Sequence, residues 1–151
     1  RGQIVISGSA SACERAVGIA AGIGLRASRL AVAGAFHSPL MAPAAAGMAK
    51  ALGEVDIQPL NTVVYSNVTG KPHEPNNPEL LKQRLIEQLT SPVRWSEDCS
   101  SLATTLAGLE EDDRPAVHEL APGKVLKGLY RRIDKTVEVT SHDQPDPSPV
   151  S

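Results

Sequence analysis

The stretch from residue 30 to residue 52 constrains the fold most, because it predicts a strand, a tight turn and a helix in direct succession. Apolar and small residues alternate over 30–33, as in a buried strand. Ser38 and Pro39 then indicate a helix start, since the first helical turn does not need the N–H that proline lacks. His37 therefore stands just before a helix N-terminus, at a junction where α/β proteins point side chains into a ligand crevice. Spacing alone leaves two alternatives open, an active-site base and a histidine that merely fills the turn.

The rest of the chain continues this alternation of strands and helices. Short apolar runs predict further strands at 3–7, 62–66, 116–120 and 136–140. Capping residues and helical spacing predict further helices that begin near Ser11, Asn77, Ser96 and Lys124, with Gly24 as the C-cap of the first. Such alternation predicts an α/β fold with a largely parallel sheet. Residues 143–151 hold three prolines without periodicity, which predicts a disordered tail.

The composition argues against several classes of function. The formal net charge is −2 and no long basic run occurs, so nucleic-acid binding is not expected. No apolar run is long enough to predict a membrane-spanning helix. Cys13 and Cys99 are single and far apart, which favours small core residues over a disulfide or a metal pair. The four histidines lack metal-ligand spacing, so no metal site is predicted.

Four short blocks of sequence carry a resemblance to a known enzyme family. The blocks are G-Q-I-V-I-S-G (2–8), G-A-F-H-S-P-L-M (34–41), V-Y-S-N-V-T-G (64–70) with Q-L-T-S-P-V-R-W (88–95), and E-L-A-P-G-K-V-L (119–126). In this order they resemble the C-terminal half of malonyl-CoA:acyl-carrier-protein transacylases, over about residues 2–133. The resemblance implies an acyltransferase that moves malonyl from coenzyme A to the phosphopantetheine thiol of acyl carrier protein through a seryl ester, in fatty-acid biosynthesis. It implies no cofactor besides the coenzyme A thioester, which is the substrate.

The resemblance assigns catalytic roles to two residues. His37 matches the family's histidine base, which deprotonates a serine and later returns the proton to the leaving thiolate. Gln88 matches the residue whose main-chain carbonyl orients that histidine, where a triad would use aspartate. A carbonyl that accepts from Nδ1–H fixes the tautomer and leaves Nε2 free to act as a base.

Three candidate substrate-binding residues and a docking surface follow from the same resemblance. Phe36 precedes the base, as in members that take malonyl groups, and its ring is expected to exclude an α-methyl branch; a core aromatic is the alternative. Arg26 falls where the family has a basic residue near the coenzyme A phosphates, and Asn67 lies in a matching motif. A basic helix face is a candidate docking surface for the acidic acyl carrier protein, with an ordinary solvated face as the alternative: Lys124, Lys127, Arg131 and Arg132.

The resemblance also sets the expected limits of this chain. The family's serine elbow, oxyanion-hole groups and malonate-binding arginine have no match here, so the fragment alone is expected to be inactive. The expected domains are half of a small ferredoxin-like subdomain (1–35), the C-terminal part of a hydrolase-like α/β core (36–142) and the tail (143–151). A synthase acyltransferase domain and a non-catalytic remnant that binds the carrier protein are the alternatives. We expect a monomer in the bacterial cytoplasm, or in the mitochondrial matrix or plastid stroma of a eukaryote.

Overall fold

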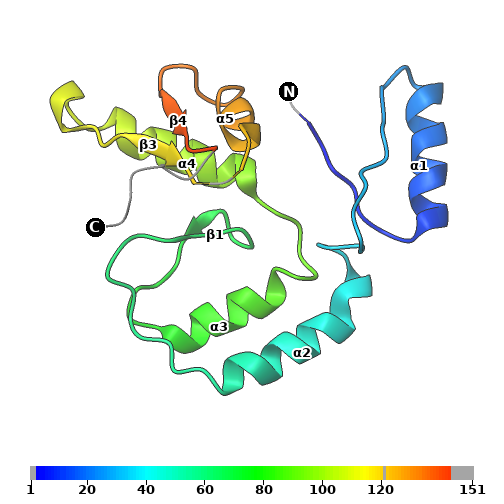
Figure 1. Ribbon diagram of the computed structural model, residues 1–151, viewed down its shortest axis with the longest axis horizontal. Helices are drawn as coiled ribbons and strands as arrows, with labels where there is room; N and C mark the ends of the chain where they lie inside the picture. Colours follow the sequence, from blue (N-terminus) through cyan, green and yellow to red (C-terminus); the bar gives the residue numbers. More distant parts are fainter. Residues whose placement is uncertain (1–2, 121, 144–151) are drawn as a thin grey trace. The chain divides into compact units, whose positions relative to one another are not determined.

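The computed structural model describes residues 3–120 and 122–143, and the chain divides into two compact units after Arg94. The first unit holds α1 (Ala10–Gly22), the 3-10 helix η1 (Pro39–Met41), α2 (Ala42–Gly53), β1 (Tyr65–Ser66), β2 (Lys71–Pro72) and α3 (Pro78–Glu87) (Figure 1). The second holds α4 (Trp95–Ala107), the 3-10 helix η2 (Glu111–Asp113), β3 (Val117–Glu119), α5 (Val125–Tyr130) and β4 (Val139–Ser141). The alternation of helices and strands confirms the α/β class. The domain boundaries predicted at 35/36 and 142/143 stay predictions, and residues 144–151 of the predicted tail lie outside the described residues.

Local capping signals predicted the helix ends well, with corrections at two N-termini. The predicted cap at Ser96 is wrong, because α4 begins at Trp95 and Ser96 lies inside the helix. The Asn77 side chain accepts a hydrogen bond from the Leu80 N–H at 3.1 Å and starts α3, as predicted. α1 ends at Gly22 with Ile23 as its C-cap, so Gly24 follows one residue later than predicted, at φ +74°. The predicted N-cap at Ser11 is wrong, because the hydroxyl of Ser9 accepts from the Ala12 N–H and α1 begins already at Ala10.

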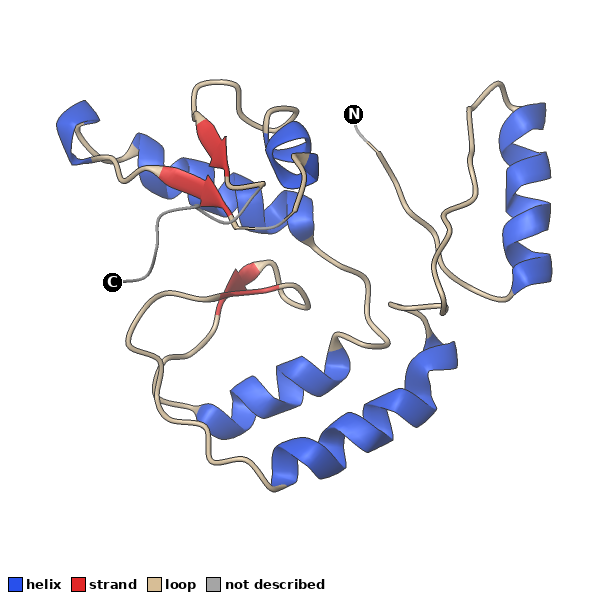
Figure 2. Cartoon of the chain, in the orientation of Figure 1, coloured by secondary structure: helices blue, strands red, loops and turns tan. Residues whose placement is uncertain are grey.

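Two of the predicted strands are absent, and their apolar side chains lie open to solvent. Residues 3–7 and 30–33 have no strand structure, and Figure 2 draws both segments as loop. Ile4 is 87% exposed and Val32 is 65% exposed. A strand needs a neighbour that satisfies its N–H and C=O groups, and no described strand pairs with either segment. The expectation of buried strands here is therefore wrong for this chain.

The sheets are smaller than predicted, and only one is parallel. β3 pairs with β4 in parallel, with Val117 opposite Val139 and Glu119 opposite Ser141. β1 pairs with β2 antiparallel, so the strand predicted at 62–66 shrinks to one arm of a short hairpin. A parallel sheet is confirmed for β3 and β4, but a largely parallel sheet through the whole chain is not seen among the described strands.

The core of the second unit forms where α4, α5 and β4 meet. Cys99, Tyr130 and Val139 are buried together, which confirms Cys99 as a small core residue. Burial, and then the neighbouring Asp98 carboxylate, raises the pKa of the Cys99 thiol to about 11. Val125, in the first turn of the six-residue α5, is 68% exposed and lies outside this core.

Asp98 is an ionisable group in the buried face of α4. Its residue is only 8% exposed, and one carboxylate oxygen, Oδ1, has no hydrogen-bond partner among the described residues. Burial, and then the Glu97 carboxylate, raises the pKa of Asp98. The charged form of this side chain therefore costs the folded state free energy.

Candidate active site

His37 stands in a backbone conformation that side chains with a Cβ rarely adopt. Its φ is +63°, and it is the one non-glycine residue with positive φ among residues 3–120 and 122–143. The left-handed region costs an L-residue about 1–2 kcal/mol. A residue stays in this conformation only when the surrounding structure imposes it, and such residues cluster at functional sites.

The imidazole of His37 contacts the main-chain carbonyl of Gln88. His37 Nδ1 lies 2.8 Å from the Gln88 oxygen, and both residues belong to the first unit. A carbonyl oxygen only accepts, so Nδ1 carries the hydrogen and Nε2 keeps a free lone pair. His37 is exposed, and Nε2 forms no hydrogen bond within the described part of the chain. The side chain can therefore take a proton from a group that approaches Nε2.

The end of α3 supplies two carbonyls to His37. Gln88 is the C-cap of α3, and the next carbonyl, of Leu89, accepts from the His37 main-chain N–H at 3.0 Å. The carbonyls at a helix C-terminus carry partial negative charge, which stabilises a cation nearby. The segment thus fixes the residue at both its backbone and its ring.

Ser38 closes the turn that contains His37. Its side chain is buried, with the residue 4% exposed. The hydroxyl donates to the Ala35 carbonyl at 2.7 Å and accepts from the Leu40 N–H at 3.3 Å, where it caps η1. The predicted helix start at Ser38 and Pro39 is confirmed, with a turn of 3-10 helix before α2.

The Phe36 ring lies against the backbone of Gly34. A Cβ added to Gly34 would stand 3.3 Å from Cε2 of that ring, closer than ordinary contact. Phe36 is nevertheless 46% exposed in this chain, and both its predicted role as an acyl filter and the alternative of a core aromatic stay predictions. The residue directly precedes His37 in the chain, and its ring is a half-open apolar surface.

The remaining predicted site residues are Arg26, Asn67 and the four residues of the basic helix face. Arg26 and Asn67 are exposed, and no hydrogen bond or ion pair joins either to His37 within the described residues. The Asn67 carbonyl accepts from the Arg94 N–H at 2.8 Å. On the predicted basic face, Lys127 is half-buried, and three side chains are exposed: Lys124, Arg131 and Arg132.

Glu119, in the fourth motif block, ties three elements of the second unit together. Its carboxylate accepts from the N–H groups of Leu126 (2.8 Å) and Lys127 (3.1 Å) at the start of α5, and from the Ser141 hydroxyl (2.8 Å) on β4. Although burial acts to raise it, these hydrogen bonds lower the pKa of Glu119. The residue is 4% exposed, so this carboxylate has a structural role that the sequence pattern did not reveal.

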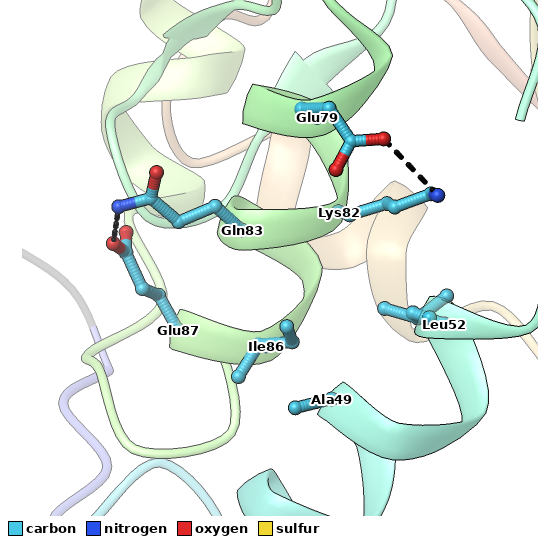
Figure 3. Close-up of a pocket in the computed structure, with 8 residues that line it drawn as sticks. Ala49, Leu52, Glu79, Lys82, Gln83, Ile86 and Glu87 are labelled. Atoms are coloured by element: carbon cyan, nitrogen blue, oxygen red, sulfur yellow. Dashed lines mark hydrogen bonds and ion pairs between the residues drawn. The ribbon is translucent and has the colours of Figure 1, made fainter.

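A shallow groove between α2 and α3 contains none of the predicted site residues (Figure 3). Its polar side chains satisfy one another: Lys82 Nζ lies 3.1 Å from Glu79 Oε1, and Gln83 donates to Glu87 at 2.7 Å. Groups that are already paired offer little to a ligand. Within the described residues, no three histidine, cysteine or acidic side chains cluster as metal ligands would, and none of the helices is long and apolar enough to cross a membrane.

Sequence reasoning missed two features of this site. One is the second carbonyl, of Leu89, and the other is the positive φ of His37. Neither leaves a local signal, because any residue carries a carbonyl and glycine, the usual mark of positive φ, is absent at position 37. The contact between His37 and Gln88 spans 51 residues, and only the family resemblance indicated it.

Curated relatives of the chain are transacylases. A protein named malonyl CoA-acyl carrier protein transacylase from Bacillus subtilis is 36% identical over 146 residues, which is 96% of this chain and 43% of that protein. A protein of Drosophila melanogaster named a probable mitochondrial malonyl-CoA-acyl carrier protein transacylase is 36% identical over 109 residues, 72% of this chain and 27% of its own length. No family model matches the chain. The chain thus spans about two fifths of the bacterial relative.

Solved structures of similar proteins share the fold. A malonyl-CoA:acyl carrier protein transacylase of Xanthomonas oryzae is 32% identical with a TM-score of 0.78, over 91% of this chain and 41% of its own. A malonyl-transacylase in complex with a type II polyketide synthase acyl-carrier protein is 31% identical, also with a TM-score of 0.78, over 91% of this chain and 42% of its own. In sequence and in fold the chain therefore matches about two fifths of the length of malonyl-CoA:acyl-carrier-protein transacylases. This match confirms the resemblance to the family that the four motif blocks indicate.

Proposed function

We propose that this chain is the C-terminal half of an acyltransferase that moves a malonyl group from coenzyme A to the phosphopantetheine thiol of acyl carrier protein, in fatty-acid biosynthesis. The observation that carries the proposal is the 2.8 Å contact of His37 Nδ1 with the Gln88 carbonyl, because it leaves Nε2 as an oriented base. The similarity to transacylases over nearly the whole chain supports it.

His37 moves one proton twice in each half-reaction. Nε2 takes the proton of a serine hydroxyl as the serine oxygen bonds to the thioester carbonyl carbon. When the carbon–sulfur bond of the tetrahedral intermediate breaks, Nε2 returns that proton to the coenzyme A thiolate. The seryl ester then reacts with the phosphopantetheine thiol, which loses its proton to Nε2 as sulfur attacks, and the serine oxygen regains it on leaving. The serine, the oxyanion-hole groups and a malonate-binding arginine come from a part of the protein outside these 151 residues.

The Gln88 carbonyl keeps the ring in the productive tautomer while the proton moves. It accepts from Nδ1–H in every step, so proton exchange is confined to Nε2. Its place at the C-terminus of α3 adds partial negative charge beside the imidazolium. A neutral carbonyl stabilises the imidazolium less than the aspartate of a triad would.

Phe36 serves as the acyl filter in this proposal. Its ring is half exposed, and the residue directly precedes the base in the chain. Bulk at this position would exclude an α-methyl branch on the acyl group. Arg26 contacts the coenzyme A phosphates, and Asn67 contributes to the substrate site. The exposed positive charges at Lys124, Arg131 and Arg132, with Lys127, attract the acidic acyl carrier protein.

The finer architecture belongs to the same proposal. Residues 1–35 form part of a small ferredoxin-like subdomain, 36–142 the C-terminal part of a hydrolase-like α/β core, and 143–151 a tail. The enzyme works as a monomer and needs no cofactor beyond its coenzyme A thioester substrate. It acts in the cytoplasm if bacterial, and in the mitochondrial matrix or plastid stroma if eukaryotic, in line with the mitochondrial name of one relative.

A second candidate is an acyltransferase domain of a fatty-acid or polyketide synthase, and the similarity to a transacylase bound to a polyketide carrier protein favours keeping it. A non-catalytic remnant that still binds the carrier protein is the third. The first two form a seryl ester, whereas the remnant does not.

Intact-mass spectrometry of the full-length protein with malonyl-CoA tests the proposal. We expect a gain of one malonyl group, which disappears when phosphopantetheinylated acyl carrier protein is added. His37→Ala should slow adduct formation about 10²–10⁴-fold, since the general base is lost. His73→Ala is the matched control, because His73 is a half-buried histidine of the same unit with no proposed role. Absence of the adduct in the wild-type protein sinks the proposed activity and leaves the remnant.

A further inference from the structure

The hydrogen bonds of Ser38 point to a residue that holds the base in place. We infer that Ser38 is a positioning residue for His37, whose hydroxyl closes the turn that keeps the imidazole on the Gln88 carbonyl. The inference rests on the proposed function, because it concerns the base of that reaction.

The backbone of His37 needs an external constraint. With φ at +63°, the residue would relax toward negative φ if the turn were free, and the imidazole would swing with it. The bond from the His37 N–H to the Leu89 carbonyl holds one side of the residue. A second constraint must act on the turn itself.

Ser38 supplies that constraint with one atom. Its Oγ donates to the Ala35 carbonyl, which closes a loop around Phe36 and His37, and accepts from the Leu40 N–H, which joins the loop to η1. A hydroxyl can donate and accept at a single oxygen, whereas alanine and valine can do neither. Serine and threonine are therefore the side chains that fit this role.

Burial makes the role specific. Ser38 is 4% exposed while the neighbouring His37 is exposed, so water does not readily replace the serine bonds. Neither side-chain hydrogen bond of Ser38 goes to the ring of His37 or to an atom proposed to react. Its effect on the reaction passes through the geometry of the turn, and a small displacement of a base is costly in rate.

The test uses the full-length protein with Ser38→Ala, Ser38→Val and Ser38→Thr. Valine and threonine have nearly the same shape and differ in the hydroxyl. Ser66→Ala is the matched control, because Ser66 is also 4% exposed and caps the Val68 N–H in the same unit. One readout is kcat and KM for malonyl transfer, and the other is ¹⁵N NMR of the His37 imidazole, which reports whether Nδ1 or Nε2 carries the hydrogen.

We expect Ser38→Ala and Ser38→Val to lower kcat about 10–100-fold at a nearly unchanged KM. Ser38→Thr should recover most of the rate, and Ser66→Ala should keep it. In the NMR spectrum, valine should mix the two tautomers and threonine should keep the hydrogen on Nδ1.

Two results overturn the inference: equal rates and equal tautomers for the valine and threonine variants, or a loss of kcat in Ser66→Ala as large as in Ser38→Ala. If Ser38→Ala does not fold, the valine and threonine pair decides. If the wild-type protein forms no malonyl adduct, the proposed function fails, and the tautomer readout alone still decides the role of Ser38.

Discussion

Replacing His37 by glycine and by alanine separates the backbone strain of the site from its chemistry. Both substitutions remove the imidazole and its bond to the Gln88 carbonyl, so that loss cancels between the two variants. They differ in the Cβ, which at φ +63° costs alanine about 1–2 kcal/mol relative to glycine. Glycine also makes the unfolded chain more flexible than alanine does, which reduces this difference in folding stability by about 0.4–1 kcal/mol. We expect His37→Gly to be more stable than His37→Ala by about 1 kcal/mol.

Ala46→Gly provides the matched control. Ala46 is exposed within α2, where glycine costs a helix about 0.8–1.0 kcal/mol relative to alanine. Glycine in place of alanine should therefore stabilise the folded protein at position 37 and destabilise it at position 46. The two effects differ by about 2 kcal/mol, well above the error of a denaturation experiment.

Urea unfolding of the full-length protein, followed by circular dichroism, measures both effects. The malonyl adduct assay on the same samples should find His37→Gly as inactive as His37→Ala. A glycine variant that is less stable than the alanine variant, by an amount close to that of Ala46→Gly, would refute the reasoning. It would mean that position 37 does not hold positive φ in the protein.

Three further substitutions test other groups. Gln88→Ala should keep malonyl transfer within about threefold of the wild-type rate in steady-state assays, because the main-chain carbonyl stays; a large loss would contradict the assignment. Glu119→Gln should lower the melting temperature most near neutral pH, because the pKa of Glu119 is depressed and its stabilisation is lost as the pH falls through that pKa; a difference independent of pH would argue against an ionised Glu119. Asp98→Asn should become more stable than the wild type as the pH rises through the elevated pKa of Asp98, because only the wild type then buries a charged carboxylate. Thermal unfolding from about pH 3 to about pH 7 measures this difference in stability. A variant that loses stability relative to the wild type as the pH rises would contradict the burial effect.

The parts of the fold that local chemistry decides could be predicted from the sequence. Asn77 before Pro78 starts α3, and Gly24 marks the end of α1 to within one residue, because caps depend on a few neighbouring residues. The strands predicted at 3–7 and 30–33 failed for the opposite reason. An apolar run becomes a strand only when another strand pairs with it, and the pattern within the run does not reveal the partner.

The candidate site shows the same division. The junction at Ser38 and Pro39 indicated a helix start and drew attention to His37 from spacing alone. Gln88 could not be found in that way, because it acts through a main-chain atom and its side chain carries no signal. Only the motif blocks of the family indicated the contact, and no pattern indicated the positive φ.

The atom that orients His37 has a consequence for how mutations affect the site. Every amino acid carries a peptide carbonyl, so no single-codon exchange at position 88 deletes the acceptor. A codon inserted between Glu87 and Gln88 would instead shift the carbonyls of Gln88 and Leu89 together, and the ring and backbone of His37 would lose both partners at once. We therefore expect position 88 to tolerate drift among amino acids, while the length of the chain at the end of α3 stays fixed.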